Sequence, residues 1–503
     1  MALTQQISLP SGTTLNCPTG LFINNEFVPS VDSRETLECI NPATEDVICS
    51  VVAASVKDID VAVQAARDAL KTTWGKNVTG FERSRLIHKL ADLIERDAQA
   101  LAELETLNNG KPLKVARDFD IADSVQCLRY YAGWADKITG QNIEVDRKKI
   151  AAFTTHDPIG VCGQIIPWNY PINMWAWKVG PALACGCTIV MKPSEVTPLT
   201  SLKLSELVKE AGFPPGVLNT VPSLGNVGGA AIAAHLDVDK VAFTGSTITG
   251  RKIMEAAARS NLKKVSLELG GKSPHIVFNS ADLDQAASWA ALGICYNTGQ
   301  DCTAGSRLYV QSGAYDKFIE ILLKKIEEHV IGDGFDEKSA GGPLVSKAQY
   351  ERVWGYIEAG KAEGAQVLCG GVKREGKGYY ADPTVFAGIK PEMKIVQEEI
   401  FGPVLCVGKF ETEEEAINLA NDTTYGLGAG LHSSDVNQCM RVSSSLEAGT
   451  VWINEYNLLY PNVPFGGKKR SGIGRELGSY ALEEYTSVKS VILNFGERLD
   501  WPL

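Results

Sequence analysis

The chain has 503 residues, of which 44% are hydrophobic and 22% are charged, and its formal net charge is −11. This length predicts two or three domains of a globular protein. The acidic balance argues against a nucleic-acid-binding protein, which would present a basic surface. The sequence has no apolar run of membrane-spanning length, and the first twenty residues do not resemble a secretory signal. We therefore expect no membrane partner and a cytoplasmic location.

Helical periodicity dominates residues 57–137. Short apolar runs then begin at residues 161, 187, 217, 240 and 264, with helix-like segments between them. Strands and helices that alternate at this spacing predict βαβ units and a parallel sheet. A second alternating series follows Gly271 and predicts a second α/β half, which meets the first half near residues 267–274.

The predicted fold class is therefore α/β, with two Rossmann-like, parallel-sheet domains and a small β arm. The changes of pattern place the boundaries as follows: 1–137, the N-terminal helical part of the first domain; 138–158, the first segment of the arm; 159–270, the nucleotide-binding part of the first domain; 271–480, the second domain; and 481–503, the last strand of the arm.

The two arm segments lack the helices that would cover a strand in either half, and the C-terminal tail has no evident partner strand within the chain. Unpaired strand edges commonly pair with another subunit. We therefore expect a homodimer or a homotetramer, since closed symmetric assemblies are the usual outcome.

Two stretches of the first half have the pattern of a nucleotide site, although G-x-G-x-x-G is absent. The strand that ends at Thr244 runs into Gly245, Ser246 and Gly250, at a helix start whose N–H groups favour a phosphate. Lys192 and Glu195 follow another strand, where a carboxylate can accept hydrogen bonds from both ribose hydroxyls and repel a 2′-phosphate. Taken alone, the glycine stretch is better explained as an ordinary strand-to-helix turn. The stretch with Lys192 and Glu195 is more informative, although a solvated ion pair that opens the next helix would also explain it.

Cys302, in the stretch GQDCTAGSR, stands among small residues just before an apolar run, where a structural cysteine is unusual. Glu268 ends a strand-like run 34 residues earlier, before two glycines. A buried carboxylate has a raised pKa and serves as a general base near neutral pH. The spacing of about one α/β unit allows both groups to face one cleft.

The chain is similar to NAD(P)-dependent aldehyde dehydrogenases over nearly its whole length. The resemblance rests on seven stretches that occur in the order of the family: PWNYP, MKPSEVTP, FTGSTITG, LELGGKSP, GQDCTAGSR, QEEIFGPV and PFGGKKRSGIGRELG. It implies the fold of this family, with residues 271–480 as the catalytic domain and the two arm segments as an oligomerisation arm.

The resemblance implies that the Cys302 thiolate attacks the aldehyde carbonyl. Asn169 and the Cys302 backbone N–H would stabilise the oxyanion, and Glu268 would activate the water that hydrolyses the thioester. Lys178 and Glu476 match a pair proposed to relay protons, although each would also fit an ordinary ion pair.

The resemblance further implies NAD as the cofactor, with NADP less favoured because of Glu195. The residues expected at the cofactor are Ile166, Trp168, Lys192, Glu195, Gly225, Gly245, Ser246, Gly250, Glu399 and Phe401. Ser223 stands where relatives commonly have glycine, which leaves the geometry of the pyrophosphate-side loop open.

The expected substrate tunnel is aromatic and partly polar, which fits an aromatic or medium aliphatic aldehyde. Its expected lining residues are Tyr170, Asn173, Met174, Trp177, Tyr296, Asp301, Thr303, Tyr456, Asn457, Leu459 and Phe465. An alternative places a cationic aminoaldehyde next to Asp301, as in betaine-type relatives.

Two other classes of protein remain open: a non-enzymatic structural relative and a cofactor-independent esterase. The twelve cysteines and six histidines do not form the short-spaced clusters of a zinc site, so we expect no metal. Most of the thiols are expected to be reduced and buried.

Overall fold

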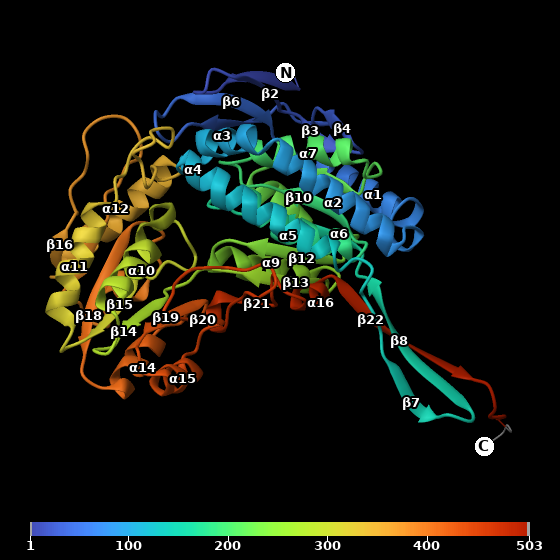
Figure 1. Ribbon diagram of the computed structural model, residues 1–503. Coiled ribbons are helices and arrows are strands. Elements are labelled where there is room, and N and C mark those ends of the chain that lie inside the picture. Colours follow the sequence, from blue (N-terminus) through green and yellow to red (C-terminus); the bar gives the residue numbers. More distant parts are fainter. Residues whose placement is uncertain (1–2, 500–503) are drawn as a thin grey trace.

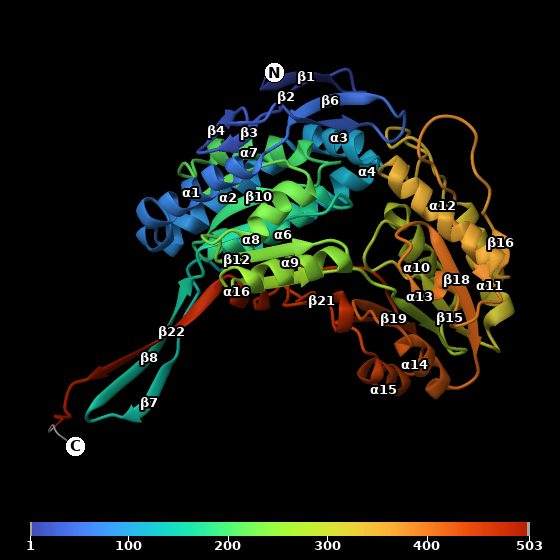
Figure 2. The same ribbon diagram turned by 180° about the vertical axis from the view of Figure 1, so that it is seen from behind.

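The computed structural model describes residues 3–499 and has the predicted α/β fold. Two α/β domains lie next to each other, and a narrow β arm extends away from the first (Figure 1). Figure 2 shows the same arrangement from behind. No helix within residues 3–499 is long and apolar enough to cross a membrane.

The first domain contains an eight-stranded sheet of order β21-β13-β12-β9-β10-β11-β3-β4. The five strands predicted from the apolar runs form its parallel centre: β9 (Val161–Ile165), β10 (Thr188–Lys192), β11 (Leu218–Thr220), β12 (Lys240–Thr244) and β13 (Lys264–Glu268). The two edges are antiparallel additions: β3 (Leu21–Ile23) with β4 (Glu26–Val28), and β21 (Gly472–Ile473).

Helices cover both faces of this sheet (Figures 1 and 2). One apolar core contains side chains of α2 (Gly80–Arg96), α5 (Ala122–Ala132), α6 (Pro171–Ala184) and α7 (Leu199–Ala211). Another contains side chains of α1 (Val56–Thr72), α8 (Ala230–Ala234) and α9 (Thr247–Arg259). Capping boxes begin two of these helices, with Ser55 and Asp58 at α1 and Thr79 and Glu82 at α2.

The description of residues 1–137 as a helical part is wrong for the segment before α1. The part that precedes α1 forms short strands: β1 (Thr4–Ser8), β2 (Thr14–Pro18), β3, β4, β5 (Thr36–Ile40) and β6 (Val47–Val52). These strands pair mostly with one another as hairpins, so each is too short and too local to give a clear period-2 pattern. Helices α3 (Ala98–Asn109) and α4 (Leu113–Val115) lead towards the cavity described below.

The second domain contains a seven-stranded sheet of order β16-β17-β18-β15-β14-β19-β20. Only the β16–β17 pair is antiparallel among its described strands. The strands are β14 (Pro274–Val277), β15 (Arg307–Gln311), β16 (Gln366–Cys369), β17 (Thr384–Ala387), β18 (Val404–Phe410), β19 (Gly428–His432) and β20 (Thr450–Ile453). The helices of this part of the chain are α10 (Leu283–Cys295), α11 (Tyr315–Glu327), α12 (Lys347–Ala362), α13 (Lys394–Gln397), α14 (Glu413–Asn421), α15 (Val436–Ser445) and, returning to the first domain, α16 (Tyr480–Glu484).

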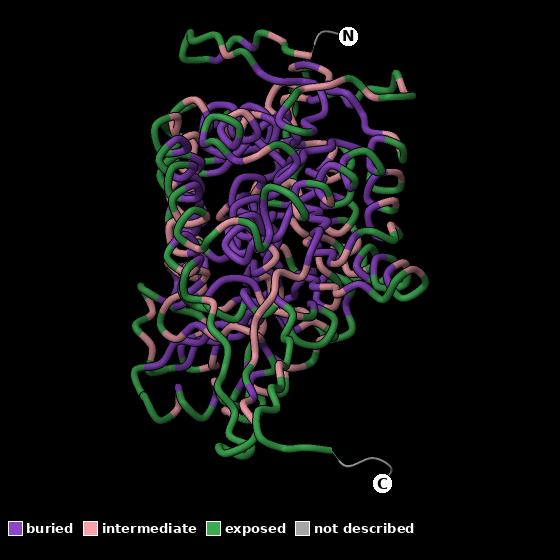
Figure 3. Tube along the Cα trace, turned by 90° about the vertical axis from the view of Figure 1, so that its right-hand side faces the viewer, coloured by how far each residue is buried: buried purple, intermediate pink, exposed green. Residues whose placement is uncertain are grey.

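The arm is a three-stranded antiparallel sheet of order β22-β8-β7, formed by β7 (Asn142–Asp146), β8 (Ile150–Pro158) and β22 (Thr486–Asn494). Strand β22 pairs with β8 over nine residues, from Thr486↔Pro158 to Asn494↔Ile150. The expectation that the tail has no partner in its own chain is therefore wrong. Pairing across more than 300 residues leaves no local signal in the sequence. The outer strands of the arm, β7 and most of β22, are exposed, whereas most residues of the central strand β8 are half-buried (Figure 3).

Candidate active site

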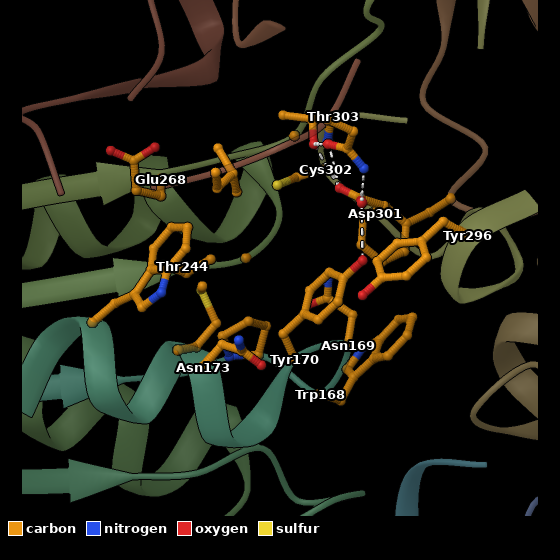
Figure 4. A pocket seen from close by; sticks show the side chains of 18 of the residues that line it. Trp168, Asn169, Tyr170, Asn173, Thr244, Glu268, Tyr296, Asp301, Cys302 and Thr303 are labelled. Carbon is orange, nitrogen blue, oxygen red and sulfur yellow. Dashed lines mark hydrogen bonds between the residues drawn. The ribbon is translucent and has the colours of Figure 1, made fainter. Parts of the chain in front are cut away.

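A cavity of about 560 Å³ lies between the two domains and brings together most of the predicted site residues. Its wall includes the loop after β9, helix α6, the carboxyl ends of β12 and β13, and loops of the second domain. Ligands bind at this end of the strands in open α/β sheets. Figure 4 shows Cys302 projecting into the open centre of the cavity, with Glu268 to one side and Tyr170 and Tyr296 to the other.

The loop that carries Cys302 has an unusual backbone. Asn297, Thr298 and Gly299 have φ values of 48°, 54° and 67°, all in the left-handed region. A Cβ on Gly299 would lie 2.2 Å from the Gly402 carbonyl oxygen, so this position accepts only glycine. The turn directs the chain from α10 back into the cavity and leaves Cys302 half-buried there.

The environment of Cys302 disfavours the thiolate. Burial raises the pKa of Cys302 well above its usual range, and the neighbouring carboxylates of Asp301, Glu399 and Glu268 raise it further. Cys302 and Cys369 are the two thiols among the described residues that are not fully buried.

Glu268 ends β13 at the cavity wall and is 5% exposed. Neither of its carboxylate oxygens has a hydrogen-bond partner among the described residues. Burial raises its pKa well above the usual range, and Glu476 adds to this shift, whereas Lys178 opposes it. A carboxyl group with a raised pKa and free oxygens is suited to accept a proton from water.

Lys178 and Glu476 form a buried ion pair with an Nζ–Oε1 distance of 2.5 Å. The Lys178 ammonium also donates to the Thr244 hydroxyl at 2.6 Å. Glu476 lines the cavity, while Lys178 lies behind the wall. The predicted pair is therefore in contact, next to Glu268.

Asn169 lies in the loop after β9 and lines the cavity with Trp168. Its side-chain Nδ2 donates to the Gln300 carbonyl oxygen at 3.0 Å, which uses one of its two hydrogens. The second hydrogen remains for a ligand oxygen.

Five of the predicted cofactor residues line this cavity: Trp168, Gly245, Ser246, Glu399 and Phe401. Glu399 accepts the Gly271 N–H at 3.0 Å, and burial raises its pKa to about 7. A Cβ on Gly270 would lie 2.2 Å from Glu399 Oε2, which explains the first glycine of LELGG. The Phe401 ring packs edge-on against Trp168, with centroids 5.2 Å apart.

The other predicted cofactor residues lie outside the lining of this cavity: Ile166, Lys192, Glu195, Gly225 and Gly250. Lys192 donates to Glu195 at 2.9 Å, and Glu195 accepts the Gly225 N–H at 3.5 Å. These contacts place the β10 loop and the loop at Gly225 next to each other.

Two of the residues predicted at the start of α9, Ser246 and Gly250, stabilise the helix and its packing. Ser246 caps α9 by accepting the Thr249 N–H. Gly250 lies inside the helix, where a Cβ would meet Leu269 at 2.7 Å. Its small size therefore allows close packing against Leu269. Its N–H donates to the Ser246 carbonyl oxygen at 2.9 Å inside the helix, so, contrary to the expectation, it is not free for a phosphate.

 Ser223 donates to the Ala54 carbonyl oxygen and accepts the Gly228 N–H, so the serine holds the loop that precedes Gly225 in a defined conformation.

The predicted substrate residues line the cavity, with one exception. Tyr170 and Tyr296 stack with centroids 6.3 Å apart, and Trp177 meets Phe465 edge-on at 5.6 Å. The lining residues are Tyr170, Asn173, Met174, Trp177, Tyr296, Asp301, Thr303, Asn457, Leu459 and Phe465.

Tyr456 is the exception. Its ring is fully buried and stacks on His275 with centroids 4.5 Å apart, and its hydroxyl donates to the Thr303 carbonyl oxygen at 2.8 Å. It therefore supports the wall from behind, and the expectation that it faces the substrate is wrong.

The carboxylate of Asp301 accepts hydrogen bonds from neighbouring groups of the protein. Its Oδ2 accepts the Tyr170 hydroxyl at 2.9 Å and the Asn457 amide at 2.7 Å. Its Oδ1 accepts the Thr303 N–H at 2.9 Å and lies 2.8 Å from the Thr303 hydroxyl. This carboxylate shapes the cysteine loop and has little capacity left for a substrate cation.

Several residues at the cavity or directly behind it were not predicted from the sequence: Asn109, Lys111, Phe119, Asp123, Asn297, Gln349 and Arg352. Asn109 and Lys111 lie in the stretch ETLNNGKPL, where adjacent amides and a lysine before a proline were the available signal. Asn297 is only five residues before Cys302.

Comparisons with known proteins agree with this geometry. Residues 27–491 match the model of the aldehyde dehydrogenase family. An aldehyde dehydrogenase of Emericella nidulans is 54% identical over 482 residues, which cover 96% of each chain. An NAD+ complex of an aldehyde dehydrogenase from Bacillus cereus is 52% identical, with a TM-score of 0.93, and 95% of this chain and 97% of that chain are covered. A betaine aldehyde dehydrogenase from Staphylococcus aureus, also in complex with NAD+, is 40% identical, with a TM-score of 0.93 and 96% of each chain covered. The chain therefore belongs to the aldehyde dehydrogenase family.

Proposed function

We propose that this protein oxidises an aldehyde to a carboxylic acid with NAD+, through a thioester on Cys302. The observation that carries the proposal is the convergence of Cys302, Asn169 and Glu268 on one cavity between the two domains. A thiol, an amide donor and an unpartnered buried carboxyl group are the three functions that this reaction requires.

In the first step the Cys302 thiolate attacks the aldehyde carbon and forms a thiohemiacetal. The free Asn169 N–H, together with the Cys302 backbone N–H, stabilises the negative charge that develops on the aldehyde oxygen. Bound NAD+ supplies the acceptor for the hydride that leaves this carbon. Sulfur suits this position because it is both a good nucleophile and a good leaving group.

In the second step Glu268 accepts a proton from water, and the resulting hydroxide attacks the thioester. The carboxylic acid is released and the Cys302 thiol is restored. The raised pKa of Glu268 makes it a stronger base than an exposed carboxylate. The Lys178–Glu476 pair next to it would carry the proton away from the cavity.

The residues present fit a bound NAD+. Glu195 follows the carboxyl end of β10 with a side chain that is 39% exposed, so its carboxylate can accept hydrogen bonds from ribose hydroxyls. Glu399 and Phe401 would hold the nicotinamide end, and Ile166, Trp168, Lys192, Gly225, Gly245 and Ser246 would line the path between them. The negative charge of Glu195 favours NAD+ over NADP+.

The substrate that fits best is an aromatic or medium aliphatic aldehyde, because the rings of Tyr170, Tyr296, Trp177 and Phe465 contribute to a largely apolar cavity wall. A cationic aminoaldehyde is the second candidate. Asp123 favours it, because this carboxylate lies on the same wall and accepts only from the Asn173 amide and the Trp177 indole among the described residues. A kinetic panel of aromatic, aliphatic and amino aldehydes distinguishes the two.

The test of the proposed reaction is NADH formation from NAD+ and benzaldehyde, followed by absorbance. Wild-type protein and Cys369→Ser are expected to form NADH, and Cys302→Ser is expected to form none. Cys369 is the matched control because it is the other half-exposed thiol. Ester hydrolysis without NADH formation would favour the esterase class, and neither activity would favour a structural role.

We also propose a cytoplasmic protein that assembles as a homodimer or homotetramer. Twelve unpaired cysteines support a reducing compartment. The unpaired edges of the arm, β7 and β22, support pairing with a second copy. Cell fractionation and sedimentation are the corresponding measurements.

A further inference from the structure

The carbonyl oxygen of Asn169 is held from two sides by buried side chains. Asn297 donates to it from Nδ2 at 3.0 Å, and Lys111 donates to it from Nζ at 3.1 Å. Lys111 is 2% exposed and is paired with Asp120, and Asn297 is 6% exposed. A carbonyl oxygen with two lone pairs is thereby saturated.

The same amide of Asn297 reaches the cysteine loop. Its Nδ2 also donates to the Gln300 carbonyl oxygen at 3.1 Å, which is the acceptor of the Asn169 side-chain amide. Gln300 is fixed in turn by Asn297 and Pro343 carbonyls and by the Val345 N–H. Both hydrogens of the Asn297 amide are therefore used, one on each of the two loops.

We propose that Asn297 is a positioning residue that sets the distance between the oxyanion donor Asn169 and the nucleophile Cys302, with Lys111 as its support on the Asn169 side. The two loops come from different domains, so their separation is not fixed by a single sheet. Asn297 itself has a left-handed backbone, with a φ of 48°. This inference rests on the proposed function, because it assigns a role within that reaction.

The rate of the reaction depends strongly on the positions of the reacting groups. A displacement of about 1 Å between reacting groups costs on the order of 100-fold in rate. Loss of one oxyanion donor costs about 100- to 1,000-fold in kcat. Loosening the Asn297 contacts should therefore lower kcat by about 10- to 100-fold, with little effect on NAD+ affinity.

The experiment uses Asn297→Gly, because glycine accepts the left-handed backbone and removes the whole side chain, including the amide. The matched control is Asn25→Gly. Asn25 is also buried, has a φ of 62° and donates its amide to a backbone carbonyl, that of Phe213, at 2.7 Å. We expect Asn297→Gly to lower kcat and the rate of the first NADH turnover by at least about tenfold, while the control stays within about twofold of wild type.

A double-mutant cycle with Asn169→Ala separates positioning from a purely structural effect. If Asn297 acts through Asn169, Asn297→Gly should cause less than a threefold further loss once Asn169 is alanine. The proposal would be overturned if Asn297→Gly lowered kcat by the same factor in the wild-type and Asn169→Ala backgrounds. It would also be overturned if Asn297→Gly did not lower kcat in the wild-type background. Wild-type protein without aldehyde-dependent NADH formation would instead refute the proposed function.

Should Asn297→Gly unfold at a lower temperature than Asn25→Gly, Asn297→Ser provides the second variant. Its shorter hydroxyl side chain fills part of the space but cannot bridge two carbonyls. The same cycle with Asn169→Ala is expected to show the same non-additivity, and additivity there would also overturn the proposal.

Discussion

The Lys178 ammonium and the Glu476 carboxylate are in contact at 2.5 Å although 298 residues separate them in the chain. Both are buried, and the unpartnered carboxyl group of Glu268 lies close enough for each of them to shift its pKa. Burial contributes most to the raised pKa of Glu268, the residue that we propose as the general base, and the two members of the pair shift this pKa in opposite directions.

Changing the two members of this pair should move the pH dependence in opposite directions. Glu476 raises the pKa of Glu268 and Lys178 lowers it. The acidic limb of the kcat profile is therefore expected to move to lower pH in Glu476→Gln and to higher pH in Lys178→Met. Steady-state kinetics from acidic to alkaline pH measures this, and shifts of the same sign would contradict the account.

Lys178→Met should also destabilise the protein, since it leaves Glu476 buried without its cation. Breaking a buried pair costs about 3–5 kcal/mol. The matched control is Lys209→Met, which breaks the exposed Lys209–Glu26 pair at 2.7 Å and should cost less than about 1 kcal/mol. Denaturant unfolding of both variants checks this, and equal effects would argue against a tightly buried pair.

Glu268→Gln should make Cys302 easier to alkylate. The Glu268 carboxylate contributes to the raised pKa of Cys302, so its removal lowers that pKa and increases the thiolate fraction at a given pH. Iodoacetamide inactivation at pH 8 is expected to be faster in Glu268→Gln than in the control Glu195→Gln. Slower alkylation would indicate instead that Glu268 activates the thiol.

Glu195 should decide between the two cofactors. We expect kcat/KM to favour NAD+ over NADP+ by at least about tenfold, or ~1.4 kcal/mol, and Glu195→Gln to narrow this preference. Glu206→Gln is the control, because Glu206 forms the same i,i+3 pair with Lys203 on α7. A wild-type preference for NADP+ would exclude the assignment of Glu195.

The arm should mediate assembly. Ile492 on β22 is 71% exposed. Val372, in the second domain and outside the arm, is exposed to a similar degree, at 75%, and serves as the control position. Ile492→Lys is expected to lower the sedimenting mass at micromolar protein, and Val372→Lys is expected to leave it unchanged. A wild-type chain that sediments as an active monomer would contradict this prediction.

Regular local patterns made the central strands predictable, since β9 to β13 each begin within two residues of an apolar run. The partner of β22 was not predictable, because β8 lies more than 300 residues away. Tyr456 shows a different limit: a position close to the site in sequence does not reveal which way a side chain faces. Its ring packs on His275 behind the wall.

The two hydrogen bonds that hold the Asn169 carbonyl oxygen could not be predicted from the sequence either. Lys111, Asn297 and Asn169 belong to three separate segments, and only the folded chain brings their polar groups to one carbonyl. By contrast, Cys302 and Glu268 were found because each interrupts its local pattern, a thiol among small residues and an acid at the end of an apolar run.

The most direct test of the central claim is mass spectrometry of Glu268→Gln after mixing with benzaldehyde and NAD+. Thioester hydrolysis should be slowed in this variant, so one turnover of NADH is expected to be followed by accumulation of a benzoyl group on the peptide that contains Cys302. Cys302→Ser provides the control and should carry no adduct. An adduct on another cysteine, or unchanged steady-state turnover without any adduct, would contradict the proposal that Cys302 carries the thioester and Glu268 hydrolyses it.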